Sequence, residues 1–324
     1  MKKKIIFKIV LLLIPIIFFL TFELLLRFFN YGDDFPLFTP MKSNTEKETF
    51  YFKINKDVSK RYFRNLSVSF ALDTFLKEKP DSTCRIFIQG GSTALGFPYN
   101  DSGSFPRLLL AWLEMSFPNQ HFEIINTSMT AVNSYTLLDI SDEIIQQKPD
   151  IVLIYAGHNE YYGALGVGST YKFANHPVVV HFIVRLRKFR IYQLLQNIIL
   201  PIRSNNTSTE EKPLMQIMAK EQHIAKDSKI YQAGIQQFYY NLDRLLAKYK
   251  KHDIPVFIGN LVSNEKDQNP FVTKQPDKNL KNYYDQLKNS SSVNKLALLD
   301  SMIVFDSTYA NLYFEAAQMY YKIG

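Results

Sequence analysis

The chain has 324 residues, of which 46% are hydrophobic and 15% aromatic. This composition supports one sizeable folded core with a smaller appendage and excludes a disordered chain. The single cysteine, Cys84, excludes an intramolecular disulfide and a zinc cluster built on cysteines. The formal net charge is +8, and half of it lies in the first 27 residues. The rest of the chain therefore carries too little positive charge to indicate nucleic-acid binding.

The first thirty residues are dominated by one apolar segment. From Ile5 to Leu26 the side chains are nearly all aliphatic or aromatic, and a helix of this length covers about 33 Å, enough to cross a bilayer. A cleaved signal peptide and a buried core helix are the alternatives. The large residues that follow Leu26 do not form a signal-peptidase site. We therefore predict residues 1–30 to be an uncleaved transmembrane anchor.

Charges on the two sides of this segment predict its orientation. Lys2, Lys3 and Lys4 precede it, whereas Asp33 and Asp34 follow it. Positive flanks stay on the cytoplasmic side of a membrane. We therefore expect a single-pass protein of the cell membrane, with a cytoplasmic N-terminus and the bulk of the chain outside the cytoplasm.

Strand and helix patterns alternate beyond an N-terminal extension, which we place at residues 31–83. Apolar runs indicate strands over 84–89, 122–125, 150–160 and 254–264, and helical periodicity covers 105–117, 133–147 and 231–251. Such alternation predicts an α/β fold with a parallel sheet covered on both faces. Residues 84–265 are the expected core, with a helical insert around 176–230, and the third strand, 150–160, is expected to be fully buried.

The stretch RIFIQGGSTALGFP, Arg85 to Pro98, ends a predicted strand on two glycines and a serine. Ligands of parallel sheets lie at the carboxyl ends of strands, and a tight glycine turn can lift the Ser92 side chain into that crevice. A phosphate-binding turn and a plain turn with serine as the helix N-cap are the alternatives. A phosphate loop favours a lysine after its glycines, and Gly90 to Gly96 contains none.

The stretch YAGHNEYYG, Tyr155 to Gly163, ends the third predicted strand. If this strand lies near the first, the Asn159 amide meets Ser92 in the crevice. Acyl transfer needs a hydroxyl that attacks and N–H donors for the oxyanion that develops. Asn159 could supply one donor from its side chain and Ser92 another from its backbone. A turn residue that closes the strand is the alternative for Asn159.

These residues resemble the SGNH (GDSL-type) serine hydrolases, and within them a membrane-anchored subgroup with tetratricopeptide-like helices. GGSTALGFP is similar to the nucleophile block, INTSMTAVNSY (125–135) to the second block and GHNE (157–160) to the third. The resemblance covers roughly residues 50 to 324. It implies a flavodoxin-like three-layer αβα fold that hydrolyses or transfers acyl esters, with Ser92 as nucleophile and Asn159 as oxyanion donor.

Two departures from the family pattern lie within the blocks. Gly91 stands where the family has aspartate before the nucleophile, and Thr93 where it has leucine, but neither position carries the chemistry. Ser128 stands in place of the second-block glycine, whose backbone N–H is an oxyanion donor in the family. Serine keeps the N–H and adds a Cβ, which would strain a position with positive φ, so we expect weakened catalysis.

The catalytic base of the family is missing. The family carries it near the C-terminus as Asp-x-x-His, and none of the six histidines here follows an aspartate at that spacing. A serine hydroxyl without a base is a poor nucleophile at neutral pH. His158 is the substitute nearest in sequence, with a structural hydrogen bond as the alternative role.

The end of the chain, YANLYFEAAQMYYKIG (309–324), resembles the first helix of a tetratricopeptide repeat, with residues 295–305 as the helix before it. Such repeats are helix pairs that bury one another. We expect residues 266–324 to be an incomplete segment of this kind in a chain truncated before the Asp-x-x-His block. A trimmed scaffold protein is the alternative.

Two further stretches have alternative interpretations. Residues 176–203 carry an apolar stripe and a basic face, which suits either a membrane surface or packing on the chain's own domain. Residues 159–169 hold Tyr161 and Tyr162 among glycines, which suits either a substrate loop with aromatic platforms for a sugar or an ordinary turn.

The sequence thus predicts a membrane-anchored SGNH-type esterase or acyltransferase without its base. Its substrate is expected to be an acyl ester, with esters of cell-surface carbohydrate as the favoured class, and the C-terminal helices are a candidate site for a protein partner. Neither a cofactor nor a metal is expected. The catalytic set is Ser92, Ser128 and Asn159, and the substrate-loop set is Gly91, Gly157, His158, Tyr161 and Tyr162. The alternative function is an inactive SGNH core used for binding.

Overall fold

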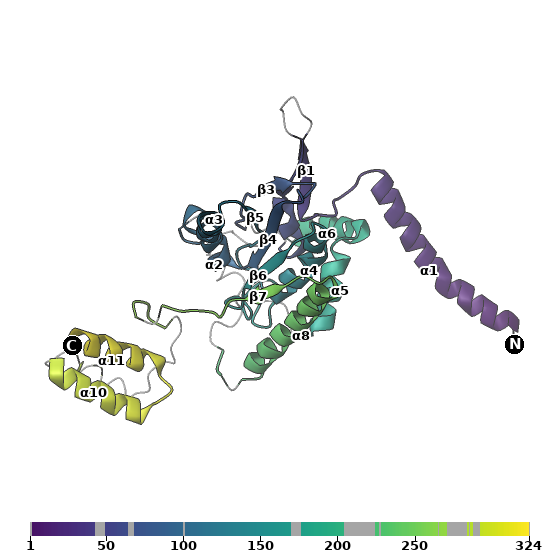
Figure 1. Ribbon diagram of the computed structural model, residues 1–324. Coiled ribbons are helices and arrows are strands. Elements are labelled where there is room, and N and C mark those ends of the chain that lie inside the picture. The colour runs from purple at the N-terminus through teal and green to yellow at the C-terminus, as the bar shows by residue number, and fades with distance from the viewer. Residues whose placement is uncertain are drawn as a thin grey trace. The chain divides into compact units, whose positions relative to one another are not determined.

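The computed structural model of the chain is shown in Figure 1, and it describes residues 2–42, 49–63, 68–99, 101–169, 176–203, 224–226, 228–264, 266–270, 284, 286–287 and 292–323. The chain divides into two compact units, residues 1–261 and 262–324. The candidate site lies wholly in the first unit.

A four-stranded parallel sheet forms the centre of the first unit, in the order β5-β4-β6-β7. The strands are β4 (Thr83–Gly90), β5 (His121–Asn126), β6 (Ile151–Tyr155) and β7 (Val256–Ile258). β4 lies between β5 and β6, and seven of its eight residues are buried, including the run from Arg85 to Gly90. The predicted α/β fold with a parallel sheet is confirmed.

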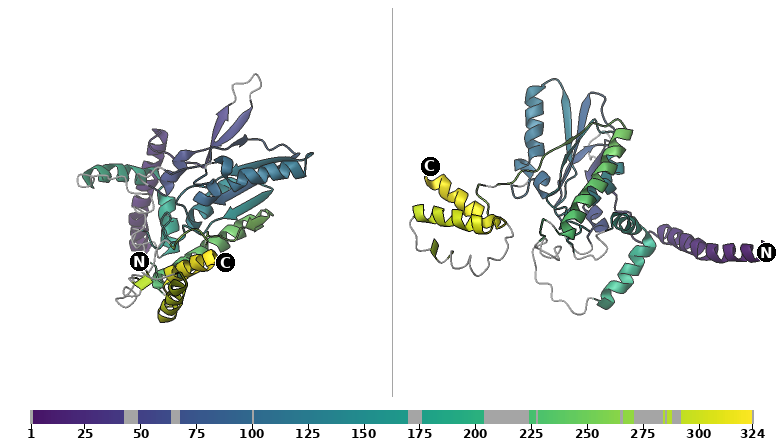
Figure 2. Two further views of the ribbon diagram at one scale, coloured as in Figure 1. Left: turned by 90° about the vertical axis from the view of Figure 1, so that its left-hand side faces the viewer. Right: turned by 90° about the horizontal axis from the view of Figure 1, so that it is seen from below.

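Helices cover both faces of this sheet, because side chains alternate between the faces along each strand. Ile86 and Ile88 of β4 point to α2 (Ser92–Leu95) and α3 (Phe105–Ser116). Phe87, between them, points to the opposite core, which includes residues of α4 (Ser134–Ile145) and α8 (Lys229–Lys251). Figure 2 shows these layers, with the sheet between α3 and the pair α4 and α8.

Two expectations about the strands are wrong. β6 is not fully buried, because its residues alternate between buried and half-buried, with Val152 and Ile154 on the covered face. The fourth strand was expected over 254–264 but spans only Val256–Ile258, because β6 ends at Tyr155 and Ile258 already pairs with Ile154. A strand stops where its neighbour offers no further partners.

The N-terminal extension builds a second, antiparallel sheet that packs on the core. Its strands are β1 (Phe38–Lys42), β2 (Phe50–Ile54) and β3 (Thr74–Leu76), and a short 3-10 helix, η1 (Lys56–Arg61), follows β2. The rings of Phe38, Phe75 and Phe87 stand edge to face, with centroids 5.1–6.0 Å apart. This aromatic contact joins the small sheet to β4.

The segment 176–203 forms two helices, α5 (Pro177–Leu186) and α6 (Arg190–Arg203). α5 buries Val180 and Val184 in the core, and buried Arg187 donates to the carbonyls of Arg61 and Tyr62 at 2.9 and 2.7 Å. These contacts favour the interpretation in which the segment packs on its own domain.

α1 (Lys2–Phe28) is joined to α6 by one buried carboxylate. Glu23 accepts hydrogen bonds from the backbone N–H of Arg190 and Ile191 at 3.1 and 3.0 Å, and from Arg27 Nε at 2.8 Å. In the part of the chain that the structure describes, no helix has the length and apolarity required to span a membrane. The anchor stays a prediction from the sequence.

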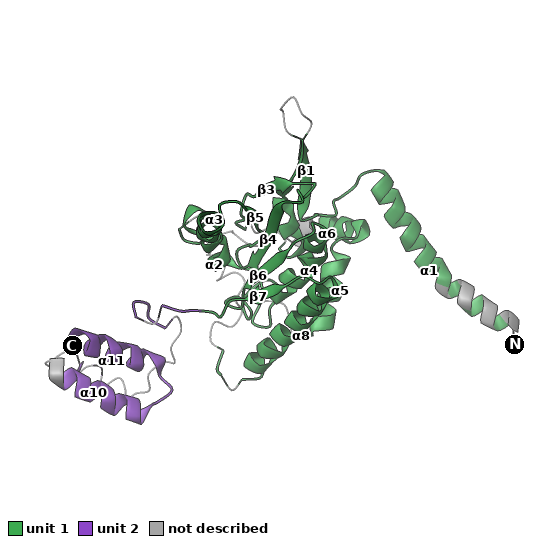
Figure 3. Cartoon of the chain, in the orientation of Figure 1, with its two compact units in different colours: residues 1–261 green, residues 262–324 purple. Residues whose placement is uncertain are grey.

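The second unit holds α10 (Ser292–Phe305) and α11 (Ala310–Ile323), drawn in purple in Figure 3. They pack through Leu299, Met302, Leu312 and Ala316. The two helices match the two predicted ones closely, and Tyr313 of α11 is 46% exposed. The tetratricopeptide assignment of 266–324 stays a prediction.

Candidate active site

The turn after β4 places Ser92 directly after two glycines. A Cβ on Gly90 would lie 2.4 Å from Ala94 Cβ and 2.5 Å from the Tyr155 carbonyl oxygen, distances that no side chain tolerates. Gly91 is the extended N-cap of α2, and Ser92 is its first residue. Gly96 ends this single turn at φ 106°, a left-handed conformation that favours glycine. Ser92 therefore stands, half-buried, at the carboxyl end of the central strand.

Asn159 comes to this turn from the neighbouring strand. Gly157, at φ 145°, turns the chain just beyond β6, and the Asn159 carbonyl accepts the N–H of Gly163 at 2.6 Å. The Asn159 side-chain nitrogen lies 3.1 Å from the point where a Cβ on Gly91 would stand. The structure thus brings the Asn159 amide to the residue that immediately precedes Ser92. The role of Asn159 as oxyanion donor stays a prediction.

Glu160, which the sequence analysis did not assign to the site, holds this segment in place. Its side-chain oxygens accept from the Ser134 N–H and hydroxyl at 3.1 and 2.6 Å, and from Gln237 Nε2 at 2.5 Å. Gln237 Nε2 also donates to the Glu160 carbonyl at 2.9 Å. Burial raises the pKa of Glu160, although the bonds from Ser134 and Gln237 act to lower it. The one sequence signal for this role is its position directly after Asn159.

Ser128 lies close to the turn, but its backbone N–H already donates to another residue. Its side chain is fully buried, and its Oγ would lie 3.3 Å from a Cβ on Gly90. Its backbone N–H donates to Asn126 Oδ1 at 3.1 Å, so an oxyanion would have to displace that bond. Ser128 is not among the residues with positive φ, so the strain considered for a serine at this position is not observed. Its role as oxyanion donor stays a prediction.

Asn126 is a second site residue that the sequence analysis did not identify. It ends β5, and its side-chain Nδ2 donates to the Ala94 carbonyl of α2 at 3.0 Å. Its backbone N–H donates to Asp73 Oδ2 at 2.6 Å. Because its Oδ1 also holds the Ser128 N–H, Asn126 fixes the distance between the nucleophile turn and the second block. No local pattern in the sequence marks this function.

Within the described residues, no hydrogen bond connects the Ser92 hydroxyl to a base. His158 is exposed, and its ring packs edge to face on Tyr155 at 5.5 Å. His181 is hydrogen-bonded to Asn241 in α8. His121 is the first residue of β5, and His252 is the C-cap of α8 before β7. His176 is the N-cap of α5, and His223 lies outside the described residues.

An apolar cavity adjoins the nucleophile turn. It encloses about 600 Å³ and is lined by Thr93 and Gly96 of that turn and by ends of the strands β6 and β7. Its aromatic lining comes from Phe97, Tyr99, Phe105, Tyr155 and Phe257. On this face of β6 the side chains of Leu153 and Tyr155 are half-buried and line the cavity. Concave, mostly apolar cavities beside polar groups are typical ligand sites.

The predicted substrate loop is built against α8. The Tyr161 ring stacks on Tyr231 at 5.8 Å, and its hydroxyl donates to the Tyr231 carbonyl at 3.2 Å. A Cβ on Gly234 would lie 2.1 Å from the Tyr161 ring. Tyr161 therefore packs closely on the helix, and Tyr162 lies beside it with ring centroids 6.5 Å apart. A sugar platform at this loop stays a prediction, as does the role of His158.

Metal ligands do not gather in the described part of the chain, where no group of three or more histidine, cysteine, aspartate or glutamate side chains is placed to hold an ion. The candidate site consists of Ser92, the Asn159 amide and the adjacent apolar cavity, with Glu160 and Asn126 as supports.

Comparison with known proteins finds relatives among solved structures alone, since no protein-family model and no curated protein matches the chain. The chain is similar to AlinE4, an SGNH-hydrolase family esterase, at 14% identity over 65% of this chain and 96% of that chain, with a TM-score of 0.30. It is also similar to the acetyl xylan esterase AlAXEase, at 12% identity over 54% and 76%, with a TM-score of 0.28.

A third similar structure is a putative acylhydrolase from Bacteroides fragilis, at 17% identity over 66% of this chain and 90% of that chain, with a TM-score of 0.26. The structural neighbours are thus SGNH-type and other ester-hydrolysing proteins.

Proposed function

We propose that the chain carries an SGNH-type serine esterase or acyltransferase site. The observation that carries this proposal is the position of the Asn159 side-chain nitrogen, 3.1 Å from where a Gly91 Cβ would stand, directly beside the Ser92 turn. A nucleophile and an oxyanion donor from two adjacent strands then face one crevice. This pairing is what acyl transfer requires and what a simple N-cap serine does not need.

The proposed step uses the geometry as follows. Ser92 Oγ attacks the carbonyl carbon of an ester, and the Asn159 amide and the Ser92 N–H donate to the oxyanion. The ester C–O bond then breaks, the alcohol leaves with a proton, and the acyl group stays on Ser92 until water or an acceptor hydroxyl removes it. The apolar cavity beside Thr93 would receive the acyl chain. An apolar acyl group is therefore the proposed substrate class.

The proton of the Ser92 hydroxyl must pass to a base in this step, and no described residue is bonded to it. This observation favours a second candidate function, a binding protein that has the residues of the hydrolase site but no activated Ser92. The two functions differ in one measurable property, the reactivity of Ser92.

Fluorophosphonate labelling of the full chain in detergent, read by intact mass, tests the proposal, because the probe reacts with activated serines. We expect one label in the parent, none in Ser92→Ala, and labelling slowed by about a hundredfold or more in Asn159→Ala, the usual effect of removing an oxyanion donor. An unlabelled parent with the circular dichroism of a folded α/β protein would reject the enzyme and favour the binding protein.

Three finer features of the function rest on sequence. Membrane attachment through residues 1–30 with an outward-facing domain is tested by fractionation and protease protection in cells. A protein partner for 266–324 is tested by binding assays with and without that segment. Carbohydrate as the alcohol part of the substrate ester is tested by comparing acetylated oligosaccharides with simple acyl esters as substrates.

A further inference from the structure

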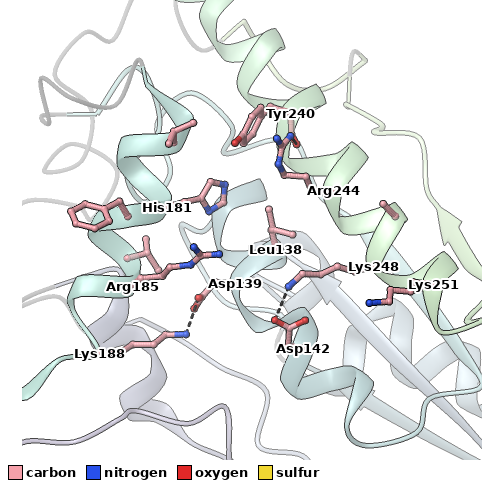
Figure 4. A pocket seen from close by; sticks show the side chains of 14 residues that line it. Leu138, Asp139, Asp142, His181, Arg185, Lys188, Tyr240, Arg244, Lys248 and Lys251 are labelled. Atoms are coloured by element: carbon pink, nitrogen blue, oxygen red, sulfur yellow. Dashed lines mark hydrogen bonds and ion pairs between the residues drawn. The ribbon is translucent and has the colours of Figure 1, made fainter. Parts of the chain in front are cut away.

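A basic cavity lies between α4, α5 and α8, lined by residues other than those of the Ser92 site. It encloses about 640 Å³. Figure 4 shows its lining, with His181 and Arg185 from α5 and Arg244 and Lys248 from α8 around a common space. The titratable groups that line it are Asp139, Asp142, His181, Arg185, Lys188, Tyr240, Arg244, Lys248 and Lys251.

Both carboxylates of the cavity are already neutralised. Asp139 accepts from Lys188 Nζ at 2.8 Å, from the Tyr62 hydroxyl at 2.7 Å and from Arg61 at 3.1 Å. Asp142 pairs with Lys248 at 2.7 Å. The dashed lines in Figure 4 mark the two lysine pairs. Five cationic side chains line the cavity. Two of them, Lys188 and Lys248, are thus paired with its carboxylates.

The other three cations, Arg185, Arg244 and Lys251, have no carboxylate partner among the described residues. Arg244 is held in position, since its guanidinium lies 3.5 Å from the centroid of the Tyr240 ring and donates to the Tyr240 carbonyl at 3.2 Å. A guanidinium fixed on an aromatic face keeps its remaining N–H groups free for a ligand. The cavity therefore has an excess of positive charge with one donor preorganised.

His181 is excluded as a fourth ligand donor through Nε2. That nitrogen lies 2.7 Å from Asn241 Oδ1, whose amide Nδ2 donates to Ser134 Oγ at 2.8 Å. Ser134 Oγ in turn donates to Glu160. The floor of the cavity is thus joined by buried hydrogen bonds to the segment that holds Asn159.

We propose that this cavity binds a phosphate group. Three unpaired cations suit a ligand with nearly two negative charges and several acceptor oxygens, which phosphate monoesters carry at neutral pH and a single carboxylate does not. The planar guanidinium of arginine can donate two parallel hydrogen bonds to two oxygens of one phosphate. The exposed apolar side chains of Val178 and Phe182 on one wall accommodate a phosphate that is carried on an apolar group as well as a free one.

The test compares the parent with the double variant Arg185→Gln/Arg244→Gln. Both side chains are exposed, so the fold is expected to survive, and matching urea unfolding curves verify this. The control is Lys229→Gln/Lys250→Gln, which removes the same charge from exposed positions outside the cavity. Full-length protein in detergent is titrated calorimetrically with inorganic phosphate, and with acetate for comparison.

We expect saturable binding of phosphate in the parent and in the control, and a dissociation constant raised at least about tenfold in the double variant. A second arm measures binding to phosphatidylcholine vesicles with and without phosphatidic acid. A preference for phosphatidic acid that needs Arg185 and Arg244, without binding of free phosphate, would identify a lipid headgroup as the source. Acetate binding equal to phosphate, or no effect of the double variant in either arm, would overturn the proposal.

Discussion

Asn159 Nδ2 and Gly91 are in such close contact that the glycine has no room for a larger residue without disturbing the amide. A Cβ at Gly91 would stand 3.1 Å from that nitrogen, tighter than ordinary van der Waals contact. The backbone of Gly91 is extended, at φ −92°, and accepts any residue. The glycine is therefore required by the amide and not by the turn.

Replacing Gly91 by alanine should displace the Asn159 amide while leaving the fold intact. We expect the side-chain NH₂ resonances of Asn159 to shift and the free energy of unfolding to change by less than about 1 kcal/mol, because a neighbouring side chain yields more easily than backbone. Nuclear magnetic resonance and urea unfolding measure both. Thr93→Ala, which changes an exposed side chain in the same turn, serves as the control. Unmoved resonances would show that the amide does not lie at Gly91.

Gly90→Ala should destabilise the protein much more than Gly91→Ala. Its Cβ would stand 2.5 Å from the Tyr155 carbonyl oxygen and 2.4 Å from Ala94 Cβ, so two backbone segments must separate. We expect a loss of about 3 kcal/mol, at the upper end for overpacking, measured as a lower urea midpoint at unchanged slope. Equal midpoints for the two variants would contradict the packing described for β4 and α2.

Glu160 should make stability depend on pH. Burial raises its pKa above the ordinary value of 4.5, so the folded state holds the proton more tightly than the unfolded state. Its stabilising contribution is then complete below pH 4.5 and is lost as the pH rises through the folded-state pKa. We expect Glu160→Gln to lose this dependence in unfolding measured from pH 4 to pH 8, whereas exposed Glu114→Gln keeps it. If the free energy of unfolding of Glu160→Gln changed with pH as steeply as that of the parent, another group would be responsible for the pH dependence.

Arg61 and Lys60 offer a matched comparison of a buried and an exposed ion pair. Arg61, 2% exposed, pairs with Asp139 and Glu143 at 3.1 and 2.7 Å. Arg61→Met leaves two carboxylates without this partner and should cost about 3 kcal/mol. Lys60 pairs with Asp57 in solvent, so Lys60→Met should cost less than about 1 kcal/mol. Similar losses in thermal unfolding would contradict the burial of Arg61.

The sequence by itself determined the features that depend on neighbours along the chain. Apolar runs placed the strands that include Ile86 and Val152, because a buried parallel strand needs apolar side chains on both faces. The two glycines before Ser92 predicted a tight turn at a strand end, and the helices that became α3, α4 and α8 followed from their periodicity. The helices that became α10 and α11 followed from the resemblance to a tetratricopeptide repeat. These are local requirements, and a local pattern expresses them.

Only the tertiary structure decided which groups meet across the fold. Glu160 meets Ser134 and Gln237, which are 26 and 77 residues away, and Asn126 occupies the N–H of Ser128. The fourth strand stops at Ile258 because β6 offers no partner beyond it, although apolar residues recur at Leu261 and Val262. Hydrogen-bond partners, strand lengths and uncovered faces are set by what packs alongside a residue, and no pattern along the chain contains that information.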